Sequence, residues 1–244
     1  GITYQRQHQV VGWHHHITDG KFKALSVIPG TTREDDVWVV TSRFVNGMDH
    51  YYVEKLEDMF NSEDARDGRF LDSHLTYDGD PTDTITGLIH LKGLEVGVLA
   101  DGTAHPPVTV SSTGTIVLNA EYSQVVVGLP YVSEVRPHLV DVSSDQSGSS
   151  RGRRQRITSI AIDLYLSLGM YVGKHSSEDG DYEEEQPFRV PTDLMGEAVP
   201  LYTGWYSMSF PEGFTEESNY FIRQKQPFPL VIRGVVDEVE VYGL

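Results

Sequence analysis

Apolar positions along the chain come in short alternating or continuous runs separated by turn residues, and helical spacing is nearly absent. Such runs predict β-strands, because successive side chains on a strand point to opposite faces. The first cluster of runs lies at residues 9–13, 22–28, 36–43 and 50–56. Asp19-Gly20 and Asn46-Gly47 separate runs and favour hairpin turns, whose central residues need positive φ. The pattern therefore predicts a four-stranded antiparallel meander.

A second group of runs lies between residues 70 and 139, after a polar segment at 59–69 that reads as a linker. Asp78-Gly79, Asp101-Gly102 and Thr113-Gly114 separate these runs, which indicates a small β-barrel or β-sandwich. One helical turn is expected within residues 86–91.

The last third begins with a serine-rich loop at residues 142–150. Residues 157–168 then alternate, and the face that carries Ile160, Ile162 and Leu164 is expected to meet a core. Residues 169–172 are expected to form its hairpin partner, and residues 175–186 an acidic loop. Strands are predicted at 201–210, 219–224 and 230–241.

The pattern predicts an all-β fold. It consists of an antiparallel meander sheet, of propeller-blade or sandwich type, with an inserted small β-barrel or sandwich module. Residues 1–60 form the first part of the sheet domain, residues 70–140 the inserted module, and residues 151–244 the second part.

Composition fits a globular protein, with 39% hydrophobic and 23% charged residues among 244. No apolar run reaches the roughly 20 residues that span a bilayer, and no signal-peptide pattern is visible. The first residues read as the start of an excised domain. The chain has no cysteine, which excludes disulfides and thiol catalysis.

The formal net charge of -17 argues against wrapping of duplex DNA, which needs clustered cations. Two interpretations of this charge remain. It keeps the protein soluble by self-repulsion, or it forms a surface that DNA passes without binding.

Three polar clusters carry side chains of the types that bind metals. On a strand only His14 and His16 of the run His14-His15-His16 share a face, too few for a structural zinc site. Asp78-Gly79-Asp80 and Glu178-Asp179-Gly180-Asp181 carry oxygen ligands suited to calcium, but neither fits an EF-hand loop. We expect no metal and no cofactor.

A basic run, Arg151-Gly152-Arg153-Arg154-Gln155-Arg156, interrupts the acidic chain. Pairing with acids of the same chain or of a neighbouring subunit is favoured over DNA binding. Most strand aromatics are expected in the core, whereas an exposed row would indicate a sugar-binding face. These aromatics are Trp13, Phe22, Trp38, Phe44, Tyr51, Tyr52, Tyr165, Tyr202, Trp205 and Tyr206.

No motif for a nucleophile elbow, a phosphate loop or a dinucleotide fold is present. Asp and Glu are numerous, but no carboxylate pair stands out as glycosidase chemistry would require. We therefore predict that the chain has no catalytic residues and is not an enzyme.

Several segments in combination resemble large tail proteins of bacteriophages and prophages. Residues 4–14 (YQRQHQVVGWH) and 18–22 (TDGKF) are followed by DVWVV at 36–40 and YVEKL at 52–56. FLDSHLTYDG at 70–79, LPY at 129–131, the basic run into Ile157 and IRQKQPFPL at 222–230 continue the pattern. The loops at 142–150 and 175–186 match it least.

The chain is thus similar to tail tube or nozzle proteins of the tail tubular protein B type, of which it would be a carboxy-terminal portion. The resemblance implies a virion structural protein, assembled in the host cytoplasm as a homo-oligomeric ring that conducts DNA during ejection. It implies contacts with other tail subunits, a tail fibre or a portal adaptor. It carries no catalytic residues and no membrane span. The alternative is a β-sandwich that binds a host glycan or attaches a tail fibre.

Overall fold

The computed structural model describes residues 2–5, 10–30, 35–138, 141, 149–150, 152–174, 182–194, 197–210, 213–216 and 218–242. Strands make up 58% of these residues and helices 3%, which confirms the all-β class. The strands form several antiparallel sheets, and none of the sheets in the described part closes into a barrel. The described residues include no helix that could cross a membrane.

The first sixty residues form a hairpin and a separate three-stranded sheet. β1 (Ile2–Gln5) pairs with β2 (Val10–Trp13). β3 (Lys21–Ile28), β4 (Asp36–Val45) and β5 (Met48–Lys55) form a meander of order β3-β4-β5. The predicted four-stranded meander is therefore wrong, because β2 takes β1 as its partner instead of β3.

The two turn dipeptides of this region have different outcomes. Asn46 (φ 51°) and Gly47 (φ 83°) form the predicted β4–β5 turn. Gly20 has a φ of 128° but closes no hairpin. A Cβ there would lie 2.4 Å from the carbonyl oxygen of Ser42, so glycine allows the chain to approach β4 closely.

The central module is a four-stranded sheet of order β6-β9-β7-β8. Its strands are β6 (Asp72–Ile85), β7 (Glu95–Ala100), β8 (Thr103–Thr109) and β9 (Ile116–Leu129). The expected helical turn is η2 (Ile89–Leu91), a 3₁₀ turn. Asp101-Gly102 forms the β7–β8 turn as predicted. Asp78-Gly79, by contrast, lies inside β6, where its pairing with β9 shifts register.

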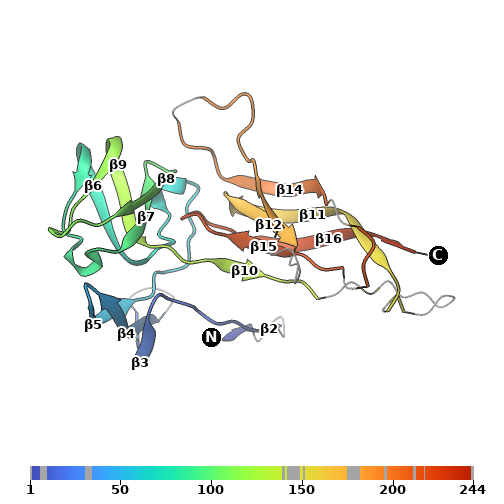
Figure 1. The fold of residues 1–244 in the computed structure, drawn as a ribbon, viewed down its shortest axis with the longest axis horizontal. Coiled ribbons are helices and arrows are strands. Elements are labelled where there is room, and N and C mark those ends of the chain that lie inside the picture. The colour runs from blue at the N-terminus through green and yellow to red at the C-terminus, as the bar shows by residue number, and fades with distance from the viewer. Residues whose placement is uncertain are drawn as a thin grey trace.

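The carboxy-terminal part is a sandwich of two sheets (Figure 1). One has the order β14-β11-β16, with β14 (Tyr202–Ser209), β11 (Gln155–Ser167) and β16 (Ile232–Val241). The other has the order β10-β15-β12-β13, with β10 (Ser133–Val135), β15 (Phe221–Gln224), β12 (Met170–Lys174) and β13 (Tyr182–Gln186). Side chains of β11, β12 and β15 share one core between the sheets.

β11 presents the face that its alternation predicts: Ile160, Ile162 and Leu164 are fully buried. Residues 169–172 are not its hairpin partner. Positive φ angles at Leu166 (43°) and Gly169 (68°) accompany the passage of the chain into the opposite sheet, where β12 pairs with β13 and β15. Residues 182–186, expected as loop, form β13, and residues 175–181 lie outside the described part.

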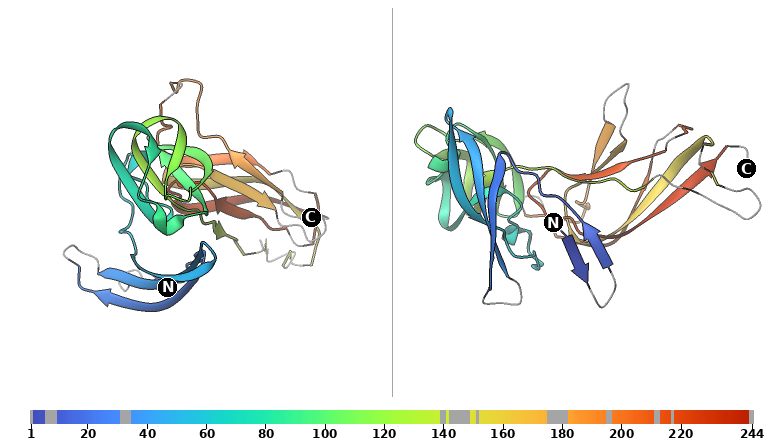
Figure 2. Two further views of the ribbon diagram at one scale, coloured as in Figure 1. Left: turned by 60° about the vertical axis from the view of Figure 1, so that its left-hand side comes forward. Right: turned by 90° about the horizontal axis from the view of Figure 1, so that it is seen from below.

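A third core cluster joins the central module to the sandwich. Leu71, Leu99 and Val126 of the module pack with Leu168 and Phe228 of the carboxy-terminal part. The sheet β3-β4-β5 lies to one side of the module (Figure 2). None of its described residues belongs to any of the three core clusters.

The division at residues 1–60, 70–140 and 151–244 stays a prediction. One strand pairing crosses it, because β10 joins β15 and so brings residues 133–135 into the sandwich. No pairing among the described strands joins β1–β5 to the sandwich sheets.

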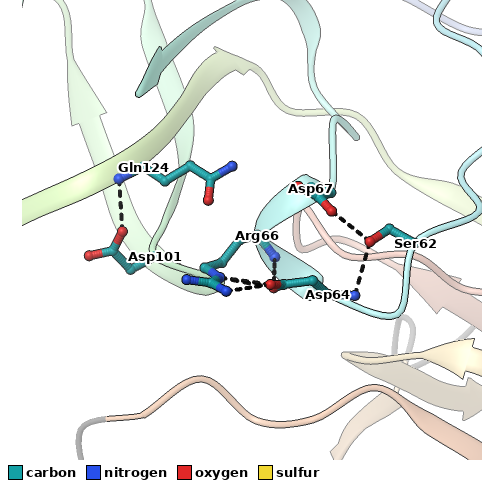
Figure 3. A network of polar contacts seen from close by, with 6 residues as sticks. All are labelled: Ser62, Asp64, Arg66, Asp67, Asp101 and Gln124. Atoms are coloured by element: carbon teal, nitrogen blue, oxygen red, sulfur yellow. Dashed lines mark hydrogen bonds and ion pairs between the residues drawn. The ribbon is translucent and has the colours of Figure 1, made fainter. Parts of the chain in front are cut away.

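The segment predicted as a linker contains η1 (Ala65–Asp67), held by a polar network (Figure 3). The Asp64 carboxylate accepts hydrogen bonds from the Arg66 backbone N–H and guanidinium. Ser62 donates to Asp67, and its hydroxyl oxygen accepts from the Asp64 N–H. These contacts cap a short turn between β5 and β6.

Candidate interaction surfaces

Arg43 on β4 is the largest buried polar side chain of the first sheet, with 2% of its surface exposed. Its Nε and Nη2 donate to Oε1 and Oε2 of Glu54 on β5, at 2.9 and 2.8 Å. Its Nη1 donates to Thr18 Oγ1 and the Asp19 carbonyl oxygen, at 2.8 and 2.5 Å. Arg43 thus holds residues 18 and 19 against the sheet, and these hydrogen bonds join three parts of the same chain.

Burial and neighbouring charges shift the pKa values of the carboxyl groups around Arg43. Burial raises the pKa of Glu54, but the hydrogen bonds and charge of Arg43 outweigh it and hold this pKa below its ordinary value. Burial raises the pKa of nearby Asp72, against a hydrogen bond from Thr18 and the charge of Arg43. Arg43 ties Glu54 of β5 to residues 18 and 19, so the cluster reads as a structural junction.

The histidine run lies next to this junction. Residues 14–16 follow the end of β2 and are not part of a strand, although the ring centroids of His14 and His16 lie 5.0 Å apart. Partial burial and the charge of His14 lower the pKa of His16. Among the described residues no three His, Asp or Glu side chains gather as a metal site requires.

Of the two acidic runs with calcium-type ligands, one lies in a described strand and the other does not. Asp80 lies in β6, and its carbonyl oxygen accepts a hydrogen bond from the Tyr77 hydroxyl at 2.6 Å. Residues 178–181 lie outside the described part of the chain. The absence of a metal and of a cofactor therefore stays a prediction.

The basic run pairs within its own chain. Arg156 Nε and Nη2 bind Glu240 Oε2 at 2.9 and 2.8 Å, and its guanidinium lies 4.9 Å from the ring centre of Phe214. Arg154 donates to the Phe214 carbonyl oxygen at 3.0 Å. Arg156 thus pairs with an acid of its own chain as predicted, whereas Arg154 contacts a backbone carbonyl oxygen and Arg151 lies outside the described residues.

Most of these strand aromatics lie outside the cores, so that expectation is wrong. None of the ten is buried, and six are exposed: Trp13, Phe22, Phe44, Tyr51, Tyr165 and Trp205. Tyr202 and Tyr206 are half-buried and pack against the sandwich core. Large apolar side chains left in water mark surfaces for binding or assembly.

One set of exposed aromatics lies on the outer face of β14-β11-β16. Trp205 (55% exposed) stands directly opposite Asp163 in the ladder, and Tyr165 (42% exposed) follows two residues along β11. Arg233 donates to Asp163 Oδ1 at 2.5 Å and lies 5.7 Å from the ring centre of Tyr165. We name Asp163, Tyr165, Trp205 and Arg233 the aromatic patch.

The other large apolar surface is the sheet β3-β4-β5. On β3, every residue is exposed, including Leu25 (66%), Val27 and Ile28. On β5, Tyr51 and Val53 (69%) are exposed as well. Hydrogen bonds tie this sheet to the preceding segment through the Arg43 junction. They also tie it to the central module, where the Tyr52 hydroxyl donates to the His90 carbonyl oxygen at 3.2 Å.

Two hollows lie in the rest of the described structure. One, of about 380 Å³, is lined by residues of β10, β15 and β16 together with Tyr131, whose pKa burial raises to about 12. The Glu134 carboxylate at its rim is paired with Arg223 and Arg136. The other, of about 310 Å³, lies between the β7–β8 turn and residues 185–189. Neither brings together a nucleophile and a base.

A half-buried carboxylate in the sandwich gives a pH-dependent prediction. Asp237 Oδ1 accepts a hydrogen bond from the Tyr220 hydroxyl at 2.8 Å, and burial raises the pKa of Asp237 above 3.8. The stability that the protonated acid contributes is complete below 3.8 and lost as pH rises through the folded pKa. We expect Asp237→Asn to unfold at higher urea than the parent at pH 7, with a smaller difference at pH 3.

Urea midpoints at several pH values measure this difference. Asp163→Asn, at the exposed aromatic patch, is the matched control and should show no such gain at pH 7. A midpoint for Asp237→Asn below that of the parent at pH 7 would contradict the assignment.

Models of known protein families give no match to the chain, and the curated proteins give none either.

Proposed function

We propose that the chain is a structural subunit of a bacteriophage tail, of the tube or nozzle type, and forms part of an oligomeric conduit for DNA ejection. The observation that carries the proposal is the sheet β3-β4-β5. It exposes many apolar side chains, among them Leu25, Val27 and Val53, and its described residues contribute to none of the three cores. Assembly with further subunits would cover such a sheet. The sequence resemblance to phage tail proteins supplies the biological setting.

Charge supports the conduit part of the proposal. A net charge of -17 repels phosphate, and the described cations of the basic run contact groups of their own chain. A wall that guides DNA without holding it needs this property. In the virion, the subunit would contact other tail subunits, a tail fibre or a portal adaptor, after assembly in the host cytoplasm. We assign no catalytic role.

Light scattering of the purified chain over a range of concentrations tests assembly. The proposal predicts a mass that rises to a fixed multiple of 27.3 kDa. A fluorescent duplex added at low salt should show no binding, because the surface is acidic. A strict monomer, or tight DNA binding, would count against the proposal.

The aromatic patch favours a second candidate, a module that binds host glycans. Trp205 and Tyr165 are exposed beside the Asp163–Arg233 pair, so aromatic rings and hydrogen-bonding groups lie close together at the surface. We expect Trp205→Ala to weaken polysaccharide binding by roughly tenfold, the equivalent of about 1.4 kcal/mol.

A glycan array followed by titration measures this effect. Trp13→Ala, which removes a more exposed indole elsewhere, should bind like the parent. No hit on the array, or equal losses in both variants, would remove the second candidate.

A further inference from the structure

The sheet β3-β4-β5 has two open edges of the same length. β3 and β5 each span eight residues, and each pairs with β4 alone among the described strands. Edge strands expose unpaired backbone N–H and C=O groups, and proteins commonly block them with proline or charge. The edge strands of the central module follow this rule, with Pro81 in β6 and Pro106 and Pro107 in β8. β3 and β5 contain no proline, and residues 24–28 of β3 contain no charge.

Both faces of the sheet expose apolar side chains, and every residue of β3 is exposed. Phe22, Leu25 and Val27 pair with Thr41, Val39 and Val37, so they continue the face on which Val39 and Thr41 are buried. On the opposite face, Phe44, Tyr51 and Val53 are exposed. A three-stranded sheet gains independent stability when an apolar face is covered. Extension of the sheet at β3 would pair the backbone of the edge and place new side chains beside the exposed apolar ones.

The charges of the two edges are complementary. β3 carries Lys21 and Lys23 and no acid, although the chain as a whole is strongly acidic. β5 carries Asp49 at the same end of the sheet, since Lys21 pairs with Ser42 and Asp49 with Phe44 two residues along β4. Lys21 and Asp49 also share a face of the sheet, because Ser42 and Phe44 do. Juxtaposed edges would therefore place opposite charges together.

We propose that β3 of one copy pairs with β5 of a second copy, so that the sheet continues from copy to copy. β3 and β5 both run antiparallel to β4, so lateral repetition joins them as a parallel pair. The contact is head-to-tail, and such contacts propagate until rotation closes a ring. The inference rests on the oligomeric part of the proposed function and needs neither DNA conduction nor a phage origin.

Cysteine cross-linking tests the pairing, because the chain has no cysteine of its own. Ala24 and Val53 both pair with Val40, so they lie at one level and on one face of the sheet. Within one copy they are two strand spacings apart, roughly 9–10 Å, too far for a disulfide. The double variant Ala24→Cys/Val53→Cys can therefore form this disulfide only between copies.

Two further double variants, Ala24→Cys with Tyr51→Cys and Ala24→Cys with Lys55→Cys, allow for a register shift of two residues. After oxidation, a non-reducing gel of at least one double variant should show a ladder of covalent multimers that ends at a fixed size. The single variant Ala24→Cys should give no multimer above the dimer.

Two results would overturn the inference. They are no ladder in any double variant, or equal dimer yields from single and double variants, which would indicate β3–β3 pairing. Light scattering of the parent separates the two proposals. An assembled parent without a ladder refutes the β3–β5 contact and leaves the proposed function standing, whereas a strictly monomeric parent refutes both.

Discussion

Replacement of Arg43 with methionine is expected to lower the free energy of unfolding by about 3–5 kcal/mol, the usual cost of leaving one partner of a buried ion pair alone. The guanidinium is 2% exposed and binds both oxygens of Glu54, Thr18 and the Asp19 carbonyl oxygen. Methionine fills similar space but supplies none of these donors. Urea unfolding followed by tryptophan fluorescence, to which Trp38 on β4 contributes, measures the loss.

Lys55→Met is the matched control for Arg43. Lys55 pairs with Asp36 at 2.8 Å at the surface of the same sheet, where solvent screens the pair, so its loss should change stability far less than the loss of Arg43. The double variant Arg43→Met/Glu54→Leu should recover part of the loss, since the uncompensated carboxylate is gone. A loss below about 1 kcal/mol for Arg43→Met would contradict the junction role.

The Arg43–Glu54 pair also predicts a pH dependence. Because the pKa of Glu54 is lowered in the folded state, the pair's contribution is complete above the ordinary pKa of 4.5 and disappears as pH falls through the folded pKa. The difference between the parent and Glu54→Gln should therefore shrink under acid.

Truncation of Ile162 to alanine is expected to cost about 2–5 kcal/mol, because it leaves a cavity in a closely packed core. Ile162 is fully buried at the middle of β11, between Tyr206 of β14 and Val235 of β16. Urea unfolding followed by circular dichroism should show a lower midpoint with an unchanged slope.

Val236→Ala on the opposite face of the same sheet is the matched control. Val236 is 57% exposed, so its truncation should change stability by no more than about 0.5 kcal/mol. Equal effects of the two substitutions would mean that β11 does not bury the face assigned to it.

Local features of the fold could be predicted from the sequence. Asn46-Gly47 and Asp101-Gly102 form the predicted turns, because the ability of Asn, Asp and Gly to adopt positive φ is a local property of these residue types. The buried face of Ile160, Ile162 and Leu164 follows from alternation. Pairing of distant strands could not be predicted in this way. The contact of β10 with β15 joins residues about ninety positions apart, and nothing local in either strand specifies the other.

The surfaces were harder to predict than the strands. Trp and Tyr are residue types that are often buried in strands. Trp205 and Tyr165 are exposed because no other described element packs over this face of the sheet. Arg43 is an ordinary strand arginine in the sequence, and only the return of residues 18–19 onto β4 buries it. The sequence predicts that the basic run pairs with acidic groups. It does not identify the partners, which are Glu240 and the Phe214 carbonyl oxygen.

The most direct test of the conduit proposal is a cryo-electron microscopy reconstruction of the assembled chain. The proposal predicts a closed ring with an open central channel, lined mainly by aspartate and glutamate side chains, and with β3 and β5 at the contacts between copies. An assembly without a channel, or a ring whose acids lie on the outer wall around a neutral or basic lumen, would contradict it.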